Sequence, residues 1–178
     1  MNILVLTSSP RRSGNTHRMA EAFARGASRA GHAVESFDLA HANIAACLAC
    51  DACRRNGGAC EQKDGMLELA PRLLAADAVA FVTPLYYYGM SAQLKTAIDR
   101  FYALNDRLLG SGKKAVLLAA CADEAEASMR PLVEHYRAVC AYLRWENAGE
   151  ALATGVWNAG DVDKTDALAR SEKLGASL

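Results

Sequence analysis

Four cysteines fall within fourteen residues of this sequence, in the segment 47–60. Their spacing is Cys47-x2-Cys50-x2-Cys53-x6-Cys60, and two glycines interrupt the longer interval. A cysteine at every third position, followed by glycines, allows the backbone to curl so that several sulfur atoms approach one centre. The first three have the spacing of the bacterial ferredoxin run, whose first three cysteines share one iron–sulfur cluster, although no proline follows the fourth. The segment therefore has the residues for metal or redox chemistry.

The residues leave the sulfur chemistry of this segment open. Four thiolates suit an iron–sulfur cluster, and they also suit structural zinc. A redox-active disulfide, or simply reduced thiols, is the third interpretation. Structural disulfides are disfavoured because we expect a cytoplasmic protein, where thiols stay reduced. The N-terminal stretch MNILVLTSSP has no basic region and too short an apolar run for a signal peptide, and no apolar run approaches the roughly twenty residues that span a bilayer.

The segment TSSPRRSGNTHRMA, residues 7–20, is rich in groups that bind anions. Just before a predicted helix it places two arginines, the Asn15 amide and the hydroxyls of Ser8, Ser9, Ser13 and Thr16. Backbone N–H groups and the helix dipole favour an anion at that position. The segment lacks the lysine of GxxxxGK[ST] and the spacing of GxGxxG, so neither nucleotide fingerprint applies. We expect a site for a phosphate monoester, with an ordinary helix cap as the alternative.

A second loop, TPLYYYGMSAQLKTAIDR at residues 83–100, is rich in aromatic side chains. Pro84 ends an apolar strand, three tyrosines follow, and Gly89 is expected to let the backbone approach a ligand. Such a loop suits a flat heteroaromatic ring, bound through stacking and main-chain hydrogen bonds. The alternative is that the tyrosines pack under the next helix or in a subunit interface.

Five predicted strands alternate with helices along the chain and must position these loops. The strands span 2–7, 33–38, 78–83, 114–120 and 145–152, and the helices span 15–30, 64–77, 91–104, 126–143 and 166–174. Apolar strands without polar alternation are covered on both faces, which is typical of a parallel α/β sheet. We predict one doubly wound domain over residues 1–178, with ligands beyond the carboxyl ends of the strands.

Charge and several isolated residues complete the sequence evidence. Lys and Arg together number 20, as do Asp and Glu, so a net charge of zero gives no electrostatic reason to expect nucleic acid or an anionic membrane as a partner. Pro71 is expected to kink or divide its helix. Cys140 lies on an apolar helix face and is expected in the core. Lys95, Asp99 and Arg100 have charge-pair spacing, which predicts an exposed or interface pair.

The two loops on this strand order resemble those of the NADPH-dependent FMN reductase group of the flavodoxin-like proteins. Within that group the sequence most resembles the iron–sulfur flavoproteins, which carry a compact cysteine motif between the loops. The resemblance extends over nearly the whole chain, to GVWNAGDV at residues 155–162. It implies a flavodoxin-like doubly wound, five-stranded parallel sheet of order 2-1-3-4-5 with helices on both faces. One departure is Asp64-Gly65-Met66, where relatives commonly have two acidic residues before the methionine.

The resemblance also implies the binding residues. The FMN phosphate would be held by Ser9, Arg11, Ser13, Asn15 and Thr16, with Ser8 and Gly14 in the same loop. The isoalloxazine would be lined by Pro84, Leu85, Tyr86, Tyr87, Tyr88 and Gly89. A third loop, with Cys121, Ala122 and Asp123, would close over the flavin, although Cys121 is also expected as a small buried residue. A [4Fe–4S] cluster near the flavin would be ligated by Cys47, Cys50, Cys53 and Cys60.

The implied function is that of an FMN-dependent NAD(P)H oxidoreductase or electron-transfer flavoprotein. FMN would carry the chemistry and NAD(P)H would be the electron donor, so no catalytic side chain is expected. A quinone, nitro or azo reductase is one alternative. A non-enzymatic flavodoxin-type electron carrier is another, which the neutral charge and the cysteine segment disfavour. A cofactor-free interaction domain is the third. We expect a homodimer or homotetramer, with the electron acceptor unidentified.

Overall fold

A five-stranded, entirely parallel sheet forms the centre of the protein in the computed structural model, which describes all 178 residues. Its strand order is β2-β1-β3-β4-β5, so the predicted order 2-1-3-4-5 and the flavodoxin-like fold are confirmed. The strands are β1 (Asn2–Thr7), β2 (Ala33–Asp38), β3 (Ala78–Pro84), β4 (Lys114–Ala120) and β5 (Glu146–Ala153). The carboxyl ends of all five strands therefore lie at one edge of the sheet.

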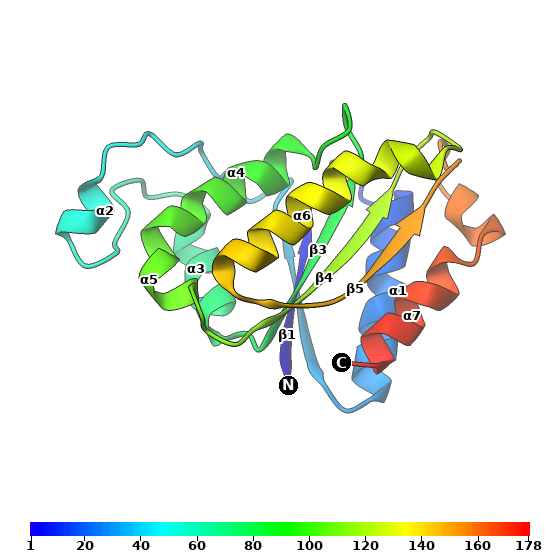
Figure 1. Cartoon of the computed structure of the whole chain (residues 1–178), viewed down its shortest axis with the longest axis horizontal. Coiled ribbons are helices and arrows are strands. Elements are labelled where there is room, and N and C mark those ends of the chain that lie inside the picture. Colours follow the sequence, from blue (N-terminus) through cyan, green and yellow to red (C-terminus); the bar gives the residue numbers. More distant parts are fainter.

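Helices cover both faces of this sheet (Figure 1). One face carries α1 (Asn15–Arg29) and α7 (Ala167–Ala176), and the other carries α3 (Met66–Ala75), α4 (Ala92–Arg100) and α6 (Arg130–Leu143). Two short helices, α2 (Ala52–Arg55) and α5 (Asn105–Leu108), and 3-10 turns at 101–104, 126–129 and 161–164 complete the elements. None of the helices combines the length and the apolar character needed to cross a bilayer.

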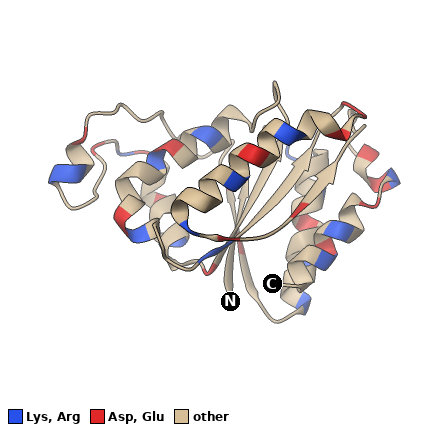
Figure 2. Ribbon diagram, viewed as in Figure 1, with Lys and Arg blue, Asp and Glu red and all other residues tan.

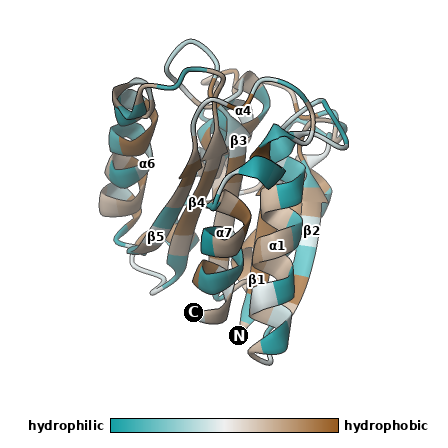
Figure 3. Ribbon diagram, turned by 90° about the vertical axis from the view of Figure 1, so that its right-hand side faces the viewer, coloured by the Kyte–Doolittle hydropathy of each residue, from teal (hydrophilic) through white to brown (hydrophobic).

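The three central strands, β1, β3 and β4, bury side chains on both faces because helices cover each face. Successive strand residues point in opposite directions, so Leu4 and Leu6 join the cluster under α3, α4 and α6, while Ile3 and Val5 join the cluster under α1 and α7. Figure 3 shows the resulting brown layer of strands between the helices. This double burial explains why the three central strands lack polar alternation in the sequence, whereas the edge strand β2 is largely exposed.

The helices α1 and α7 cross at two glycines. A Cβ atom added to Gly26 would lie 1.9 Å from the carbonyl oxygen of Glu172, and one added to Gly175 would lie 2.1 Å from that of Phe23. No real Cβ tolerates such distances, so the close approach of the two backbones requires glycine at both positions.

Three sequence expectations for the helices are changed by the structure. Pro71 lies inside α3, but the helix continues through it from Met66 to Ala75 and is not divided. The predicted helix 91–104 ends as an α-helix at Arg100 and continues as a 3-10 turn. The helix predicted from residue 126 begins with a 3-10 turn, and its α-helical part starts next to Pro131, a position that favours proline because no helical N–H is needed there.

Charged residues of both signs are interspersed along the helices (Figure 2). In this view α6 carries both blue and red segments, and so does α7. Residues of both signs therefore occur on the same helices.

Candidate functional site

The anion-binding loop and the aromatic loop meet at the carboxyl edge of the sheet and border one cavity of about 190 Å³, which we call the carboxyl-edge cavity. Its lining comes from the segments that follow β1, β3, β4 and β5: Ser9, Arg11, Gly14, Asn15, Thr16, Pro84, Leu85, Tyr86, Ala120, Cys121, Ala122, Val156, Trp157 and Ala159. Open α/β sheets bind ligands at this edge.

The first loop has free hydrogen-bond donors, and two of the residues that carry them, Asn15 and Thr16, line the cavity. The backbone N–H groups of Arg12, Ser13, Asn15 and Thr16 donate to no acceptor in the protein. The Thr16 hydroxyl also forms no hydrogen bond within the chain, although Thr16 is buried. The N-cap residue of α1 is Gly14, which has no side chain, so the hydroxyls of this loop are not used as an ordinary helix cap. Unpaired donors at the positive end of a helix fit a phosphate group.

Three predicted phosphate-binding residues have other positions or partners. The Ser8 hydroxyl is buried and donates to the carbonyl of Val82. Ser13 is exposed and does not line the carboxyl-edge cavity. The Asn15 side chain donates to the carbonyls of residues 156 and 158 (3.3 and 2.9 Å) and accepts from the N–H groups of residues 160 and 162 (3.1 and 3.3 Å). Asn15 therefore ties the first loop to the segment 156–162.

The aromatic loop makes a tight reverse turn at Tyr86–Gly89. Tyr86 and Gly89 exchange two backbone hydrogen bonds of 3.0 Å, and the two central residues, Tyr87 and Tyr88, have φ angles of +45° and +63°. The sequence predicted that Gly89 would provide the backbone freedom in this loop, but the φ angle of Gly89 is not positive. The left-handed backbone conformation is instead adopted by Tyr87 and Tyr88, where it is strained. The backbone N–H groups of Tyr87 and Tyr88 have no acceptor in the protein. Tyr86 lines the cavity, whereas the side chains of Tyr87 and Tyr88 are exposed outside it.

The third loop forms one wall of the cavity through Cys121. Its thiol is buried, donates to the Asp123 carbonyl at 3.2 Å, and has a pKa raised by that burial. The Asp123 carboxylate does not line the cavity. It accepts from the Ser128 hydroxyl and the Ala125 N–H, and both bonds lower its pKa. Asp123 thus shapes the loop.

Trp157 also lines the cavity but was missed as a site residue. Its side chain is about two-thirds exposed to solvent. The Arg11 guanidinium carbon lies 6.0 Å from the centre of its ring, and the same guanidinium donates to the Trp157 carbonyl at 3.3 Å. The available signal was an aromatic residue between two glycines in the loop after the last strand.

Cys47, Cys50, Cys53 and Cys60 all line a second, much smaller cavity of about 20 Å³. Arg100 and Tyr102 are among the other residues of its wall. All four cysteines are reduced. Their donor set fits an iron–sulfur cluster, but no three His, Cys, Asp or Glu side chains are grouped closely enough to hold a metal ion. The segment forms a loop that projects beyond the sheet, with α2 at its tip (Figure 1). It shares no residue with the carboxyl-edge cavity.

Arg100 differs from its sequence prediction. Lys95 and Asp99 do form an exposed ion pair, as predicted, but the Arg100 side chain is only 1% exposed and pairs with Asp64 at 2.6 Å. Burial opposes ionisation of Asp64, but the Arg100 hydrogen bond and two backbone N–H groups outweigh it and lower the pKa of Asp64. The neighbouring Gly65 has no room for a side chain, since a Cβ there would lie 1.9 Å from the Ala42 carbonyl oxygen.

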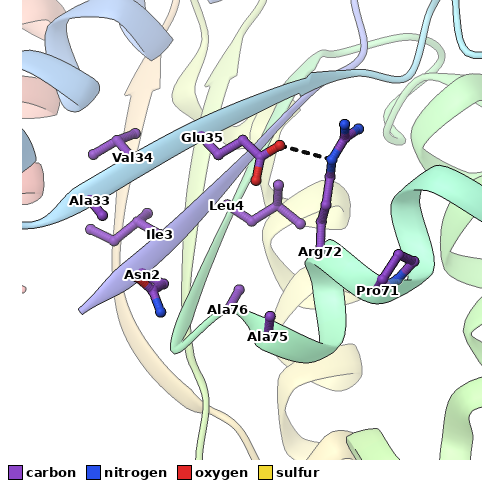
Figure 4. Close-up of a pocket in the computed structure, with 10 residues that line it drawn as sticks. All are labelled: Asn2, Ile3, Leu4, Ala33, Val34, Glu35, Pro71, Arg72, Ala75 and Ala76. Carbon is purple, nitrogen blue, oxygen red and sulfur yellow. Dashed lines mark ion pairs between the residues drawn. The ribbon is translucent and has the colours of Figure 1, made fainter.

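The protein has a larger cavity, of about 410 Å³, at the opposite edge of the sheet (Figure 4). Its walls come from the first residues of β1 and β2 and from the end of α3. Its ionisable residues, Glu35 and Arg72, pair with each other at 2.8 Å. None of the sequence motifs lies in this cavity, so the carboxyl-edge cavity is the better candidate site.

The strand order and the two loops at its carboxyl edge define a protein of the flavodoxin-like class. The chain belongs to the NADPH-dependent FMN reductase family, whose family model matches residues 1–158. It is 34% identical to an iron–sulfur flavoprotein of Archaeoglobus fulgidus over 113 residues, which cover 64% of this chain and 51% of that protein. The chain thus spans about half the length of that relative.

Two other relatives match nearly the whole chain. The putative NAD(P)H-dependent FMN-containing oxidoreductase YwqN of Bacillus subtilis is 27% identical over 165 residues, covering 87% of this chain and 86% of that protein. The solved NAD(P)H:quinone oxidoreductase from Methanothermobacter marburgensis is 24% identical, with a TM-score of 0.75 and coverage of 99% and 96%. At that identity the second likeness concerns the fold.

Proposed function

We propose that this protein is an FMN-dependent NAD(P)H oxidoreductase with a second redox centre in its cysteine loop. The observation that carries the proposal is the carboxyl-edge cavity, where unpaired donors at the start of α1 and the aromatic turn border the same space. FMN, when bound, supplies hydride and single-electron transfer. The family membership supports both FMN and a nicotinamide donor.

The protein's own residues bind and orient the cofactor in this proposal. The free N–H groups at the start of α1, the Thr16 hydroxyl and the Arg11 guanidinium hold the phosphate. The free N–H groups of Tyr87 and Tyr88 and the ring of Tyr86 position the flat ring system. Trp157 lines the same cavity and offers a further aromatic ring to the cofactor. No side chain is assigned as acid or base.

The cysteine loop would hold an iron–sulfur cluster through Cys47, Cys50, Cys53 and Cys60. Two observations support this part: the four cysteines line one cavity, and the relatives at 30–34% identity include iron–sulfur flavoproteins. A cluster would supply one-electron transfer. Because the thiols are not grouped in metal-binding geometry, the loop would have to draw together when the cluster forms.

The test begins with flavin-free protein purified without oxygen and titrated with FMN, followed by FMN fluorescence. Wild-type protein is expected to bind FMN and then to oxidise NADPH or NADH with a dye as acceptor. Thr16→Val removes one hydroxyl donor at nearly constant volume and should weaken FMN binding by about tenfold or more. Thr154→Val makes the same chemical change outside the cavity and should have an effect of less than about twofold.

The outcomes separate the parts of the proposal. No FMN binding by the wild type would overturn the flavoprotein assignment. FMN binding without NAD(P)H oxidation would indicate a flavodoxin-type carrier. After reconstitution with iron and sulfide, about four irons and four sulfides per chain would support the cluster. A flavin-loaded protein that takes up no iron would leave an FMN reductase without a second metal centre.

A second candidate function is the reduction of flat aromatic acceptors such as quinones or azo compounds. The observation that favours it is the pair of exposed aromatic residues beside the cavity, Tyr86 and Trp157, whose rings could stack on such an acceptor. Turnover with a quinone that exceeds turnover with one-electron dyes, and that falls in Trp157→Ala, would select this function.

A further inference from the structure

Arg100 holds the two ends of the cysteine loop together. One terminal nitrogen, Nη1, donates to the carbonyl of Ala45 at 2.8 Å and to Asp64 Oδ2 at 2.6 Å. Asp64 in turn accepts from the Ala45 N–H and the Met66 N–H, each at 3.0 Å. Both backbone groups of Ala45 are thus bonded to the Arg100–Asp64 pair. Residues 45 and 64 bracket all four clustered cysteines, so this pair closes the base of the loop.

The same guanidinium reaches one of the cysteines. Nη2 donates to Cys60 Sγ at 3.4 Å and to Asp64 Oδ1 at 3.3 Å. The remaining donor, Nε, is buried and has no partner. Arg100 also lines the small cavity that the four cysteines share. A buried cation with one N–H bonded to sulfur and another unpaired is suited to an anionic sulfur centre, because charge-assisted bonds stabilise negative charge on sulfur.

Other contacts of the loop are far more exposed. The Arg54 side chain contacts Tyr102, and the Tyr102 hydroxyl donates to Asp51 at 2.8 Å, but these side chains are largely open to water. Exposed charge pairs contribute little to stability. The base of the loop is therefore fixed by buried bonds, while its tip is held weakly.

We propose that Arg100 is the positioning residue of the cysteine loop: it clamps residues 45 and 64 together and orients Cys60 as an acceptor toward the centre that the cysteines bind. The role of Arg100 toward Cys60 rests on the proposed cluster. The clamp itself is a property of the metal-free chain.

The test compares Arg100→Met, Arg100→Lys and Asp64→Asn with a matched control, Lys95→Met, which removes an exposed cation from the same helix. The first measurement is amide hydrogen exchange of residues 44–66 in metal-free protein. Arg100→Met and Asp64→Asn are expected to exchange about tenfold faster there, with Arg100→Lys intermediate, because buried hydrogen bonds at the loop base are lost. Lys95→Met should match the wild type. If residues 44–66 exchange at the wild-type rate in Arg100→Lys or Arg100→Met, the proposal that Arg100 clamps the loop is wrong.

The second measurement is iron content and reduction potential after reconstitution. Arg100→Met should retain less iron and give a lower potential than the wild type, because a hydrogen bond to a cysteine sulfur is removed, and Arg100→Lys should restore part of both. Equal iron and equal potential in all variants would overturn the role toward Cys60. If Arg100→Met fails to fold, Arg100→Lys decides both measurements.

The two proposals fail in different ways. If the wild type takes up no cluster, the cluster part of the proposed function is wrong, and hydrogen exchange still tests the clamp. FMN affinity should stay within about twofold of the wild type in every variant, because Arg100 and Asp64 do not line the carboxyl-edge cavity.

Discussion

Replacing Asn15 with alanine should weaken FMN binding through a loop that the asparagine holds in place. The Asn15 side chain makes four hydrogen bonds to residues 156–162, two of them at 2.9 and 3.1 Å and two longer at 3.3 Å. Counting the two shorter bonds at about 1 kcal/mol each gives about 2 kcal/mol. Alanine has a higher helix propensity than asparagine, which offsets a few tenths of a kcal/mol of this loss. About 1.5–2 kcal/mol corresponds to a 10- to 30-fold weaker Kd.

The assay is a fluorescence titration with FMN, accompanied by urea unfolding of the flavin-free chain. The matched control is Asn158→Ala, which lies in the same segment but meets Asn15 through its backbone carbonyl alone, so its effect should be below about twofold. The reasoning is refuted if Asn15→Ala binds FMN as the wild type does, or if Asn158→Ala loses as much affinity.

Asn15→Asp separates loop support from charge. An aspartate keeps an acceptor for the N–H groups of residues 160 and 162 and favours the positive end of α1. The folded chain should therefore lose less stability than in Asn15→Ala. The new negative charge would repel a bound phosphate, so FMN binding should weaken more than in Asn15→Ala. The opposite order of the two affinities would argue against a phosphate beside this residue.

Two further predictions concern stability. Gly26→Ala should destabilise the fold by about 1–3 kcal/mol despite the better helix propensity of alanine, because its Cβ would meet the backbone of α7, whereas the exposed Ser28→Ala should not; urea unfolding measures both. Burial raises the pKa of Cys121, Cys140 and Tyr136, so these groups lose their protons less readily in the folded state than in the unfolded chain. The contribution of these three groups to stability should therefore be constant below about pH 8, and stability should fall above about pH 8.5, by up to about 1.4 kcal/mol per pH unit for each buried thiol. In Cys140→Val the decrease in unfolding free energy with pH should be less steep. An unchanged slope would show that the buried Cys140 thiol does not contribute to this pH dependence.

The sheet and its strand order could be predicted because the sequence patterns that indicate them lie within short, continuous segments of the chain. Runs such as NILVLT and AVAFVT are apolar along their whole length, which requires helices on both faces. The pair Lys95–Asp99 was also predictable, since its partners are one helical turn apart. Strand and helix limits agreed closely wherever such local patterns were strong.

The roles of Asn15 and Arg100 could not be predicted because their partners are distant in sequence. Asn15 bonds to residues 141–147 positions away, and Arg100 to residues 36–55 positions away. The position of Asn15 before a helix and the family resemblance assigned it to the phosphate, and charge-pair spacing assigned Arg100 to an exposed or interface pair. Only the fold shows that both side chains join separate segments of the chain.

The helix α4 connects the two candidate sites. At its start, the Ser91 N–H donates to the Thr83 hydroxyl and the Ser91 hydroxyl donates to the carbonyl of Ser8, so this end is fixed to both strands that carry the ligand-binding loops. At its end, Arg100 fixes the base of the cysteine loop. Nine residue steps of about 1.5 Å separate Ser91 from Arg100 by about 13.5 Å. Because hydrogen bonds anchor both ends, the distance between the sites within one chain is set by a rigid helix. If the cysteine loop binds a cluster as proposed, its exposed tip would move toward Cys60, while the base of the loop would keep its distance from the carboxyl-edge cavity.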